Sequence, residues 1–474
     1  MIDPLLDTLT APATTLIPVS AAELDTWRAQ QSPIWQAWLN TACFQAKPGQ
    51  FCLLPDIHGA LTTIAVGFDP KDTPWQLASL PQTLPSGVYS LHSDWDRPCR
   101  EAAALGWALG AYQFTSYKTD TAITTAAPPA RLFVGADADL DAVRALVAAT
   151  TFTRDLINTP AQDLLPEHLA EITQDLARQH GAVFHQWIGE ELLQNRYPLI
   201  HAVGRASASP PRLLELLWGE PDQPLLTLVG KGVCFDTGGL DLKPSSGMRL
   251  MKKDMGGAAQ ALGLAQWIMR RGLPLRLRVL IPAVENAVAG NAFRPGDVLY
   301  SRQGLSVEID NTDAEGRLIL ADALTAAVEQ SPALLVDFAT LTGAARVAVG
   351  TEIAACFSHD DALAAGLMQA AQQVNDPIWR LPLHRPYRDL LESKVADLAN
   401  ASSSGYAGAI TAALFLQAFV PPNIAWAHFD MMGWNTRARP GRPEGGEAMG
   451  LRAVAAYLEQ RFQTPVSNRV VSER

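Results

Sequence analysis

The sequence predicts an α/β protein of two domains: a small N-terminal α/β domain, followed by a domain with a largely parallel central sheet covered by helices. Its length, 474 residues, exceeds what one ordinary core supports. From Glu167 onward, segments of helical and strand pattern alternate, which is typical of parallel sheets. Polar motifs follow several of the expected strands, where functional sites of such sheets lie.

Composition limits the classes of partner. The formal charge of −11 disfavours a nucleic-acid partner, since polyanions are bound by basic surfaces. No apolar stretch approaches the roughly 20 residues of a membrane span, and residues 1–10 lack a secretory pattern, so we expect a soluble, cytoplasmic protein without a membrane partner. Five scattered cysteines without paired spacing are expected to be free, buried thiols, namely Cys43, Cys52, Cys99, Cys234 and Cys356.

The first domain is expected at residues 1–148, with a role in assembly or regulation, because it contains no polar cluster that suggests chemistry. A connecting helix and linker follow at 149–171, where the helical pattern of 139–158 is broken by Pro160. The elements expected in the first domain are strands 51–54 and 62–66, a loop at 70–85 and a helix at 101–117.

The second domain is expected at residues 172–474. Its elements alternate between short apolar runs and longer segments that are bounded by glycine and proline. We expect strands at 225–229, 275–281, 334–338 and 424–429, helices at 255–271, 319–329 and 409–419, and a frayed tail from Gln463.

The segment 311–318, NTDAEGRL, sets the carboxylates of Asp313 and Glu315 two residues apart. Ionised acids this close repel each other unless a cation binds between them. Arg317 adds a planar fork of donors that suits an anion beside that cation. A simpler alternative is that both acids merely favour the start of a helix.

A second cluster, at 229–243, carries Lys231, Asp236, Asp241 and Lys243 among four glycines. We interpret it as a glycine-rich loop after a strand. A phosphate-binding loop is disfavoured, because Leu225 and Gly232 stand where that motif requires a glycine and a Ser or Thr. The two lysines are alternatively solvated surface groups.

A third cluster contains Asp254, directly before an expected helix. Asp254 alone is well explained as a helix cap. The following pair, Gly256 and Gly257, weakens a first helical turn, which indicates that something approaches the backbone there. Together the carboxylates and the two lysines of these clusters exceed what one catalytic zinc takes and fit two divalent ions bridged by shared acids.

These clusters resemble the leucyl aminopeptidase family of dinuclear-metal peptidases, of which NTDAEGRL is the signature. Similar segments at 154–160, 337–343 and 405–416 extend the resemblance over roughly residues 150–460. After Asp430 the chain departs from the animal and plant members and looks like a shorter bacterial branch. The preference for leucine therefore remains open. In the same region, His428 is interpreted as a buried histidine, and the basic loop residues Arg437, Arg439 and Arg442 as solvated rather than as an anion site.

The resemblance implies that two divalent ions, Zn²⁺ or Mn²⁺, are bound by Lys231, Asp236, Asp254, Asp313 and Glu315. It implies that the catalytic residues are Lys243, which polarises the scissile carbonyl, and Arg317, which holds a bicarbonate ion as general base. It also implies a substrate site lined by Met251, Asn311, Thr340, Leu341 and Gly343. For Met251, a plain core role is an equal alternative.

The function implied is that of a metal-dependent aminopeptidase that removes leucine-like N-terminal residues from peptides, in a homohexamer. One alternative is a DNA-binding regulator on a peptidase fold, which the charge of −11 opposes. Another is a structural or metal-storage protein with a decayed site, which the intact set of seven metal-binding and catalytic residues opposes.

Overall fold

The computed structural model describes residues 3–119 and 130–462, so the tail expected to fray from Gln463 lies outside the described residues. The chain divides into two compact units. Unit 1 comprises Met1–Thr151 and Arg437–Glu444, and unit 2 comprises Phe152–Thr436 and Gly445–Arg474. Among the described residues, no helix is both long and apolar enough to cross a lipid bilayer.

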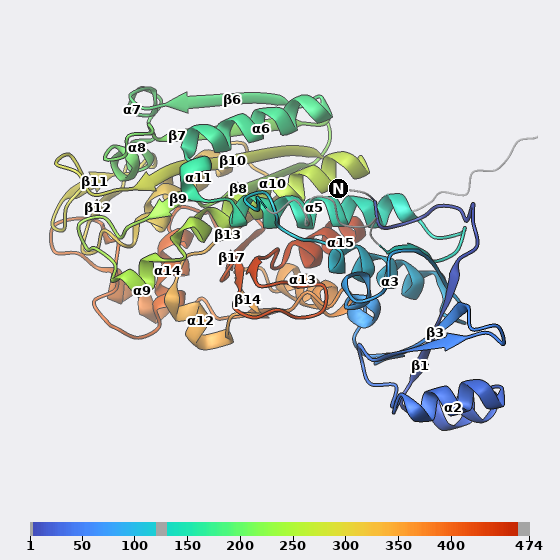
Figure 1. Cartoon of the computed structure of the whole chain (residues 1–474). Coiled ribbons are helices and arrows are strands. Elements are labelled where there is room, and N and C mark those ends of the chain that lie inside the picture. The colour runs from blue at the N-terminus through green and yellow to red at the C-terminus, as the bar shows by residue number, and fades with distance from the viewer. Residues whose placement is uncertain (1–2, 120–129, 463–474) are drawn as a thin grey trace, which may run out of the picture. The chain divides into compact units, whose positions relative to one another are not determined.

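Unit 1 is built on a five-stranded sheet with the order β2-β3-β1-β4-β5. Its neighbouring strands β1 and β3 are labelled in Figure 1. Strand β1 runs parallel to β3 and β4, β5 runs parallel to β4, and only β2 is antiparallel to its neighbour. The strands are β1 Thr14–Ser20, β2 Phe51–Pro55, β3 Leu61–Phe68, β4 Val88–Leu91 and β5 Arg131–Phe133. The helical segments before the linker are α1 Leu24–Ala29, α2 Pro33–Thr41, η1 Trp75–Leu77, η2 Leu80–Gln82 and α3 Arg97–Gly110.

Helix α3 differs from the helix expected at 101–117. It begins earlier because the side chain of Asp96 accepts a hydrogen bond from the Cys99 N–H at 3.0 Å and so caps the helix. It ends at Gly110, although Tyr112 is only 1% exposed. The expected helix was therefore too long at its C-terminal end: Tyr112 is buried outside the helix, and Tyr117 is 50% exposed. The stretch 70–85, expected as loop, contains the two short 3-10 turns η1 and η2.

Helix α5, Leu140–Asn158, leads into unit 2, whose main sheet has nine strands. The order is β15-β14-β17-β13-β8-β10-β7-β6, and β9 pairs with β10. The pairs β8–β10, β9–β10, β8–β13, β13–β17 and β14–β15 are parallel. The expected α/β class with a largely parallel sheet is therefore confirmed.

The strands of this sheet are β6 Val183–Ile188, β7 Arg212–Trp218, β8 Leu225–Gly230, β9 Gly232–Asp236, β10 Arg276–Asn286, β13 Leu334–Ala339, β14 Ala354–Phe357, β15 Ile378–Arg380 and β17 Trp426–Asp430. Two small sheets contain β11 Val298–Tyr300, β12 Ser306–Glu308, β16 Leu398–Ala399, β18 Trp434–Asn435 and β19 Gly445–Gly446.

The longer helices of unit 2 cover this sheet (Figure 1). Helices α10 and α11 both pack against β8, and all six residues of β8 are buried, so this central strand is covered on both faces. The helical segments are η3 Ala161–Asp163, α6 Pro166–His180, α7 Glu191–Gln194, α8 Pro198–Gly204, α9 Ser245–Met248, η4 Met251–Met255, α10 Gly256–Arg271, α11 Glu315–Val328, α12 Gly343–Val349, α13 Asp361–Gln373, η5 Arg385–Leu391, α14 Gly408–Gln417 and α15 Leu451–Phe462.

Two element boundaries near the polar motifs differ from expectation. The segment after Lys231 is not loop throughout, because Gly232–Asp236 forms strand β9 beside β10. Helix α11 begins at Glu315, four residues before the expected start at Ile319. The first turn of α11 contains buried polar residues, which resemble loop residues when only apolar periodicity is considered.

The glycine pair before α10 has a structural explanation. A Cβ atom on Gly257 would lie 2.1 Å from the Phe338 carbonyl oxygen and 2.8 Å from the Lys231 backbone nitrogen. The group that approaches this backbone is therefore the neighbouring strand of the same chain, where β13 lies against the start of α10.

The five cysteines are free thiols, as expected. Their burial was predicted only in part, because Cys43 is exposed and Cys99 is half-buried. The remaining three are buried in the cores, namely Cys52, Cys234 and Cys356.

Candidate metal centre

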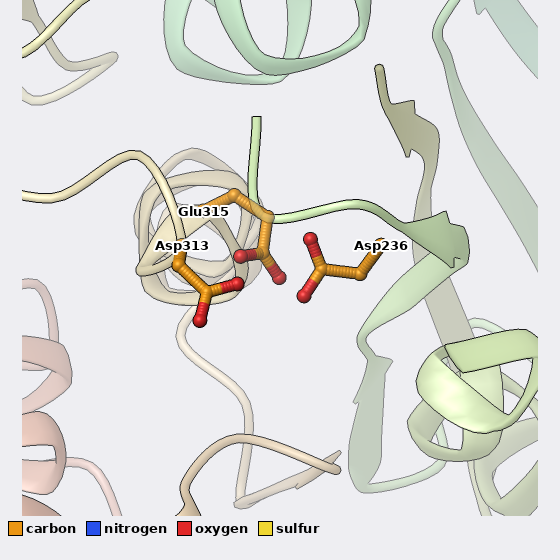
Figure 2. Close-up of side chains that lie close together, drawn as sticks. All are labelled: Asp236, Asp313 and Glu315. Atoms are coloured by element: carbon orange, nitrogen blue, oxygen red, sulfur yellow. The ribbon is translucent and has the colours of Figure 1, made fainter. Parts of the chain in front are cut away.

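Three acidic side chains from distant parts of the chain converge at one point (Figure 2). Asp236 stands at the end of β9, Asp313 in the loop before α11, and Glu315 at the first residue of α11. One carboxylate oxygen from each residue lies within 4.8 Å of the others. Asp236 precedes Asp313 by 77 positions, so the fold brings together segments that are distant in the sequence.

Lys231 links this group to the fourth acid. Its Nζ atom lies 2.7 Å from Asp254 Oδ2 and 2.8 Å from Glu315 Oε1. Lys231 is 2% exposed and Asp254 also 2% exposed, so both charges are removed from solvent. Burial alone would lower the pKa of Lys231, but the carboxylates of Asp254 and Glu315 raise it above its ordinary value.

Lys243 spans the opposite side of the group. Its Nζ atom lies 2.9 Å from Asp236 Oδ2 and also forms an ion pair with Asp313 Oδ1. Burial opposes the charge on Lys243, yet the two carboxylates raise its pKa above the ordinary value. Both lysines are thus held by pairs of acids.

The surroundings of two of the acids disfavour their charged forms. Burial and the neighbouring charge of Asp236 raise the pKa of Glu315 to about 8 and that of Asp313 to about 6. Glu315 Oε2 is buried and accepts no hydrogen bond from any described residue. Such an oxygen is a ligand atom without a partner, and buried polar atoms normally have one.

The donor set fits divalent cations. Four carboxylates and two ammonium groups carry a net charge of −2 when all are ionised. Carboxylate oxygens with one amine suit Zn²⁺, Mn²⁺, Mg²⁺ or Co²⁺ alike. The five predicted metal ligands therefore lie together, with Asp236, Asp313 and Glu315 in the tightest group and Asp254 joined through Lys231.

Hydrogen bonds from outside the group orient these acids. Asn286, at the end of β10, donates from Nδ2 to Asp236 Oδ1 at 2.9 Å and to the Thr312 carbonyl at 3.1 Å. The Thr340 hydroxyl donates to Asp254 Oδ1 at 2.8 Å. Fixing a carboxylate in this way reduces the freedom it loses on binding a metal.

Two further hydrogen bonds join the loop that carries Asp241 to the loop that carries Asp313. The backbone N–H of Thr312 donates to Asp241 Oδ2 at 2.7 Å, and the Asp241 N–H donates to the Thr312 hydroxyl at 2.9 Å. Asp241 lies two residues before Lys243, and Thr312 lies beside Asp313. The reciprocal bonds therefore fix the distance between the segments that carry Lys243 and Asp313.

Arg317 lies in the first turn of α11 and is 9% exposed. Its Nη1 donates to the Asn400 carbonyl at 2.8 Å, while its buried Nε has no acceptor within the part of the chain that is described. Burial lowers its pKa to about 10, so the guanidinium remains charged at neutral pH. It can still offer donors to an anion in the cavity.

The site opens into a cavity of about 400 Å³. All five predicted substrate-binding residues line it, as do Lys243 and Arg317. Met251 lines the cavity and is also 7% exposed, so it serves as a wall and as part of the core. The residues predicted to bind substrate are Met251, Asn311, Thr340, Leu341 and Gly343.

Three contributors to this cavity were not identified from the sequence. Asp430 Oδ1 accepts from the backbone N–H groups of Leu341 and Thr342 at 3.0 and 3.1 Å, which fixes one wall. Lys253 and Arg346 place two more cations in the lining. Lys253 is adjacent to the motif residue Asp254, but neighbouring position alone did not indicate whether it faces the cavity or solvent.

The other residues singled out near the C-terminus lie away from the cavity lining. His428 is 0% exposed and its Nδ1 lies 2.6 Å from Asp337 Oδ1, which agrees with its interpretation as a buried histidine. The guanidinium of Arg442 lies 4.3 Å from the centre of the Trp75 ring. An aromatic partner of this kind accounts for one of the three loop arginines without an anion.

Comparison with known proteins identifies the family of the chain. Residues 151–455 match the model of the cytosol aminopeptidase family, catalytic domain, and residues 14–133 match the M17 aminopeptidase N-terminal domain. A protein named probable cytosol aminopeptidase, from Geotalea uraniireducens strain Rf4, is 39% identical over 385 residues, which cover 79% of this chain and 77% of that protein.

Solved structures give the same result. The cytosol aminopeptidase of Coxiella burnetii is 46% identical, with a TM-score of 0.93, and the match covers 97% of this chain and all (100%) of that one. The bottromycin maturation enzyme BotP in complex with Mn is 33% identical, with a TM-score of 0.86 over 96% of this chain and 100% of that one. From the matched catalytic domain, the shared fold and these identities, we conclude that the chain belongs to the cytosol aminopeptidase family, a family of peptide-cleaving hydrolases.

Proposed function

We propose that this chain is a two-metal aminopeptidase that releases the N-terminal residue of peptides. The observation that carries the proposal is the convergence of Asp236, Asp313 and Glu315 within 4.8 Å, next to Lys231 and Asp254. These acids are buried, some of their oxygens accept no hydrogen bond, and the pKa values of Asp313 and Glu315 are raised. Such features are typical of acids that bind a cation. Family membership supports the same activity class.

In this proposal two divalent ions would be held by these five residues, with Asp236 and Glu315 shared between the ions. Asp313 completes one site, and Lys231 with Asp254 completes the other. Lys231 would bind as the neutral amine, which requires that its ammonium group give up a proton to solvent. When bound, the pair of ions activates a water molecule for attack and anchors the free amino group of the substrate. A manganese-bound neighbour of the same fold supports Mn²⁺ as one suitable ion.

The remaining roles belong to side chains of the chain itself. Lys243 is the cation that faces the scissile carbonyl and stabilises the negative charge that develops on its oxygen. Arg317 orients a planar anion, proposed to be bicarbonate, that accepts the proton of the attacking water. Met251, Asn311, Thr340, Leu341 and Gly343 form the wall against which the substrate is positioned.

Substrate preference, assembly and location are proposed on resemblance. A leucine-like N-terminal residue is the family expectation, and the apolar Met251 and Leu341 in the cavity wall are compatible with it. A homohexamer in the cytoplasm follows the same resemblance, and the relatives are named cytosol aminopeptidases.

The test is hydrolysis of leucinamide and of a panel of dipeptides by metal-loaded protein, with metal content measured in the same samples. We expect Asp313→Asn and Glu315→Gln to lower kcat/KM by more than about a hundredfold, beyond what loss of an outer-shell partner causes. Asp310→Asn is the matched control, because Asp310 is an exposed acid in the same loop. Full activity in both site variants would refute the assignment.

A further inference from the structure

Lys253 is a buried cation without a partner. It is 3% exposed, and it lines the cavity beside the metal centre. Within residues 3–119 and 130–462, its ammonium group forms no hydrogen bond and no ion pair. Lysine is almost never buried in this way unless an anion accompanies it, because removing the charge from water is costly. The charges of Asp254 and Asp430 act on Lys253 without forming an ion pair, and an anion bound in the cavity can reach its side chain.

Arg346 is a second cation in the lining of the same cavity, close enough to Lys253 for their charges to repel each other. It lies in α12, and a Cβ atom on Gly343 would be 3.3 Å from its Nη2, so the guanidinium lies directly over Gly343. Its other terminal nitrogen contacts the Met432 sulfur at 3.4 Å, which is a weak acceptor. Among the described residues, no carboxylate forms an ion pair with Arg346. Most of its donors therefore remain available.

The other cations of the cavity differ in this respect. Lys231 and Lys243 are each held by two carboxylates, and Arg317 donates to the Asn400 carbonyl. Lys253 and Arg346 thus form a separate positive corner, which we call the cationic corner. It adjoins Thr340, Leu341 and Gly343, the wall proposed to contact substrate.

We propose that the cationic corner binds a carboxylate group of the substrate, so that substrates with a carboxylate at that place are selected over neutral ones of the same shape. The proposal rests on the aminopeptidase function proposed above and specifies its substrate class. The carboxylate has two sources: the side chain of an N-terminal Glu or Asp, or the terminal carboxylate of a dipeptide. Arg346 supplies a planar fork and Lys253 a desolvated point charge, and hydrogen bonds between such groups and a carboxylate are charge-assisted.

Two pairs of substrates distinguish the sources. Glutamic acid α-amide and glutamine α-amide differ only in the side-chain carboxylate, while Leu-Gly and Leu-glycinamide differ only in the terminal one. Leucinamide, which has neither carboxylate, serves as the reference for activity itself. We expect wild-type protein to favour the carboxylate-bearing member of one pair by about tenfold or more in kcat/KM, since an unpaired buried charge penalises the neutral analogue.

The variants Lys253→Met and Arg346→Gln are expected to reduce that preference to near unity. Because each ratio is measured within one variant, partial loss of folded protein does not alter it. Lys252→Met is the matched control: Lys252 is the adjacent residue, and its Nζ donates to the Asn158 carbonyl at 2.5 Å instead of lining the cavity. The control is expected to keep the wild-type ratio.

Two results would overturn the proposal: wild-type protein that favours neither carboxylate, or a preference that survives both substitutions. If Lys253→Met does not fold, Arg346→Gln and the wild-type ratios still decide. Failure of the proposed function has a different signature, because metal-loaded wild-type protein would then leave leucinamide uncleaved as well.

Discussion

Gly316 occupies the first turn of α11, and its missing side chain makes room for Lys231. A Cβ atom on Gly316 would lie 2.6 Å from Lys231 Cε and 2.7 Å from its Nζ. Lys231 cannot move aside easily, because it is buried and held between Asp254 and Glu315. The glycine in the NTDAEGRL motif is therefore explained by the space that Lys231 occupies, and not by the conformation of the helix that contains it.

Replacing Gly316 by alanine should have the opposite of the usual effect. Within a helix, alanine is normally more stable than glycine by about 0.5–1 kcal/mol. Here we expect Gly316→Ala to lower the free energy of unfolding by about 1–3 kcal/mol, the range typical of overpacking. Denaturant unfolding of metal-free protein measures this change, and a variant as stable as wild type or more so would contradict the explanation.

Asn286 is expected to matter through Asp236. It is 0% exposed and holds that carboxylate with a bond of 2.9 Å. The variant Asn286→Leu keeps the approximate shape but removes the donor, so we expect affinity for Mn²⁺ to fall by about 10–100-fold. Titration calorimetry measures this loss. Asn291→Leu, at an exposed site, is the control, and equal affinities in all three proteins would exclude an orienting role.

At the scale of elements, buried charged groups connect segments that the sheet does not join. Asp322 of α11 accepts from the backbone N–H groups of Leu199 and Ile200, at 2.8 and 3.3 Å, and of Arg302, at 2.7 Å. One carboxylate thus fixes the start of α8 and a neighbouring loop to α11. Arg154 of α5 and Glu447 form another such link, with bonds of 2.9 and 3.1 Å.

Asp322 should make stability depend on pH. Burial raises its pKa from 3.8 to about 7, although the three backbone donors oppose this shift. Since the folded state binds the proton more tightly than the unfolded state, this stabilisation is complete below pH 4 and is lost as pH rises toward 7. We therefore expect the free energy of unfolding of wild type to fall relative to that of Asp322→Asn as the pH rises from 4 to 7. Denaturant unfolding at several pH values measures it, and a constant difference would contradict the shift.

Breaking the second link should be costly. Arg154→Met leaves Glu447 buried, at 4% exposed, without its cation. We expect the free energy of unfolding to fall by about 3–5 kcal/mol, the range for an uncompensated buried charge. Arg178→Met removes an exposed i,i+3 pair with Asp175 and is the control, with an expected change below about 1 kcal/mol. Similar losses in both variants would show that burial of the pair is unimportant.

At the scale of the whole molecule, the fold class was predictable because helices and strands alternate with clear periodicity in the second domain. The three acidic clusters were found because each concentrates chemistry in a few adjacent residues. The sequence did not identify the roles of Asn286, Asp430 and Arg346. Each is a single polar residue at the end of a strand or in a helix, and its partner is known only from the folded structure. The start of α11 was placed too late for a related reason: its first turn is polar because of the site, not because of solvent.

Metal binding is expected to stabilise one unit selectively. At a metal concentration of 100 times Kd, binding adds about 2.7 kcal/mol to the stability of the state that binds. Hydrogen exchange with and without Mn²⁺ should therefore show new protection in β9, η4 and the first turn of α11, with strand β1 of unit 1 as the internal control. Equal protection with and without the ion would contradict a metal site built from these segments.

The contact between Gly257 and the backbone of β13 restricts which residues position 257 can accept. Any methyl group there would have to displace a carbonyl oxygen that lies 2.1 Å from the Cβ position. Helix α10 is thereby kept against the strand that leads to Thr340 and Leu341. In a library of variants selected for new substrates, we expect substitutions to accumulate around the mouth of the cavity. Glycine at position 257 should be retained throughout.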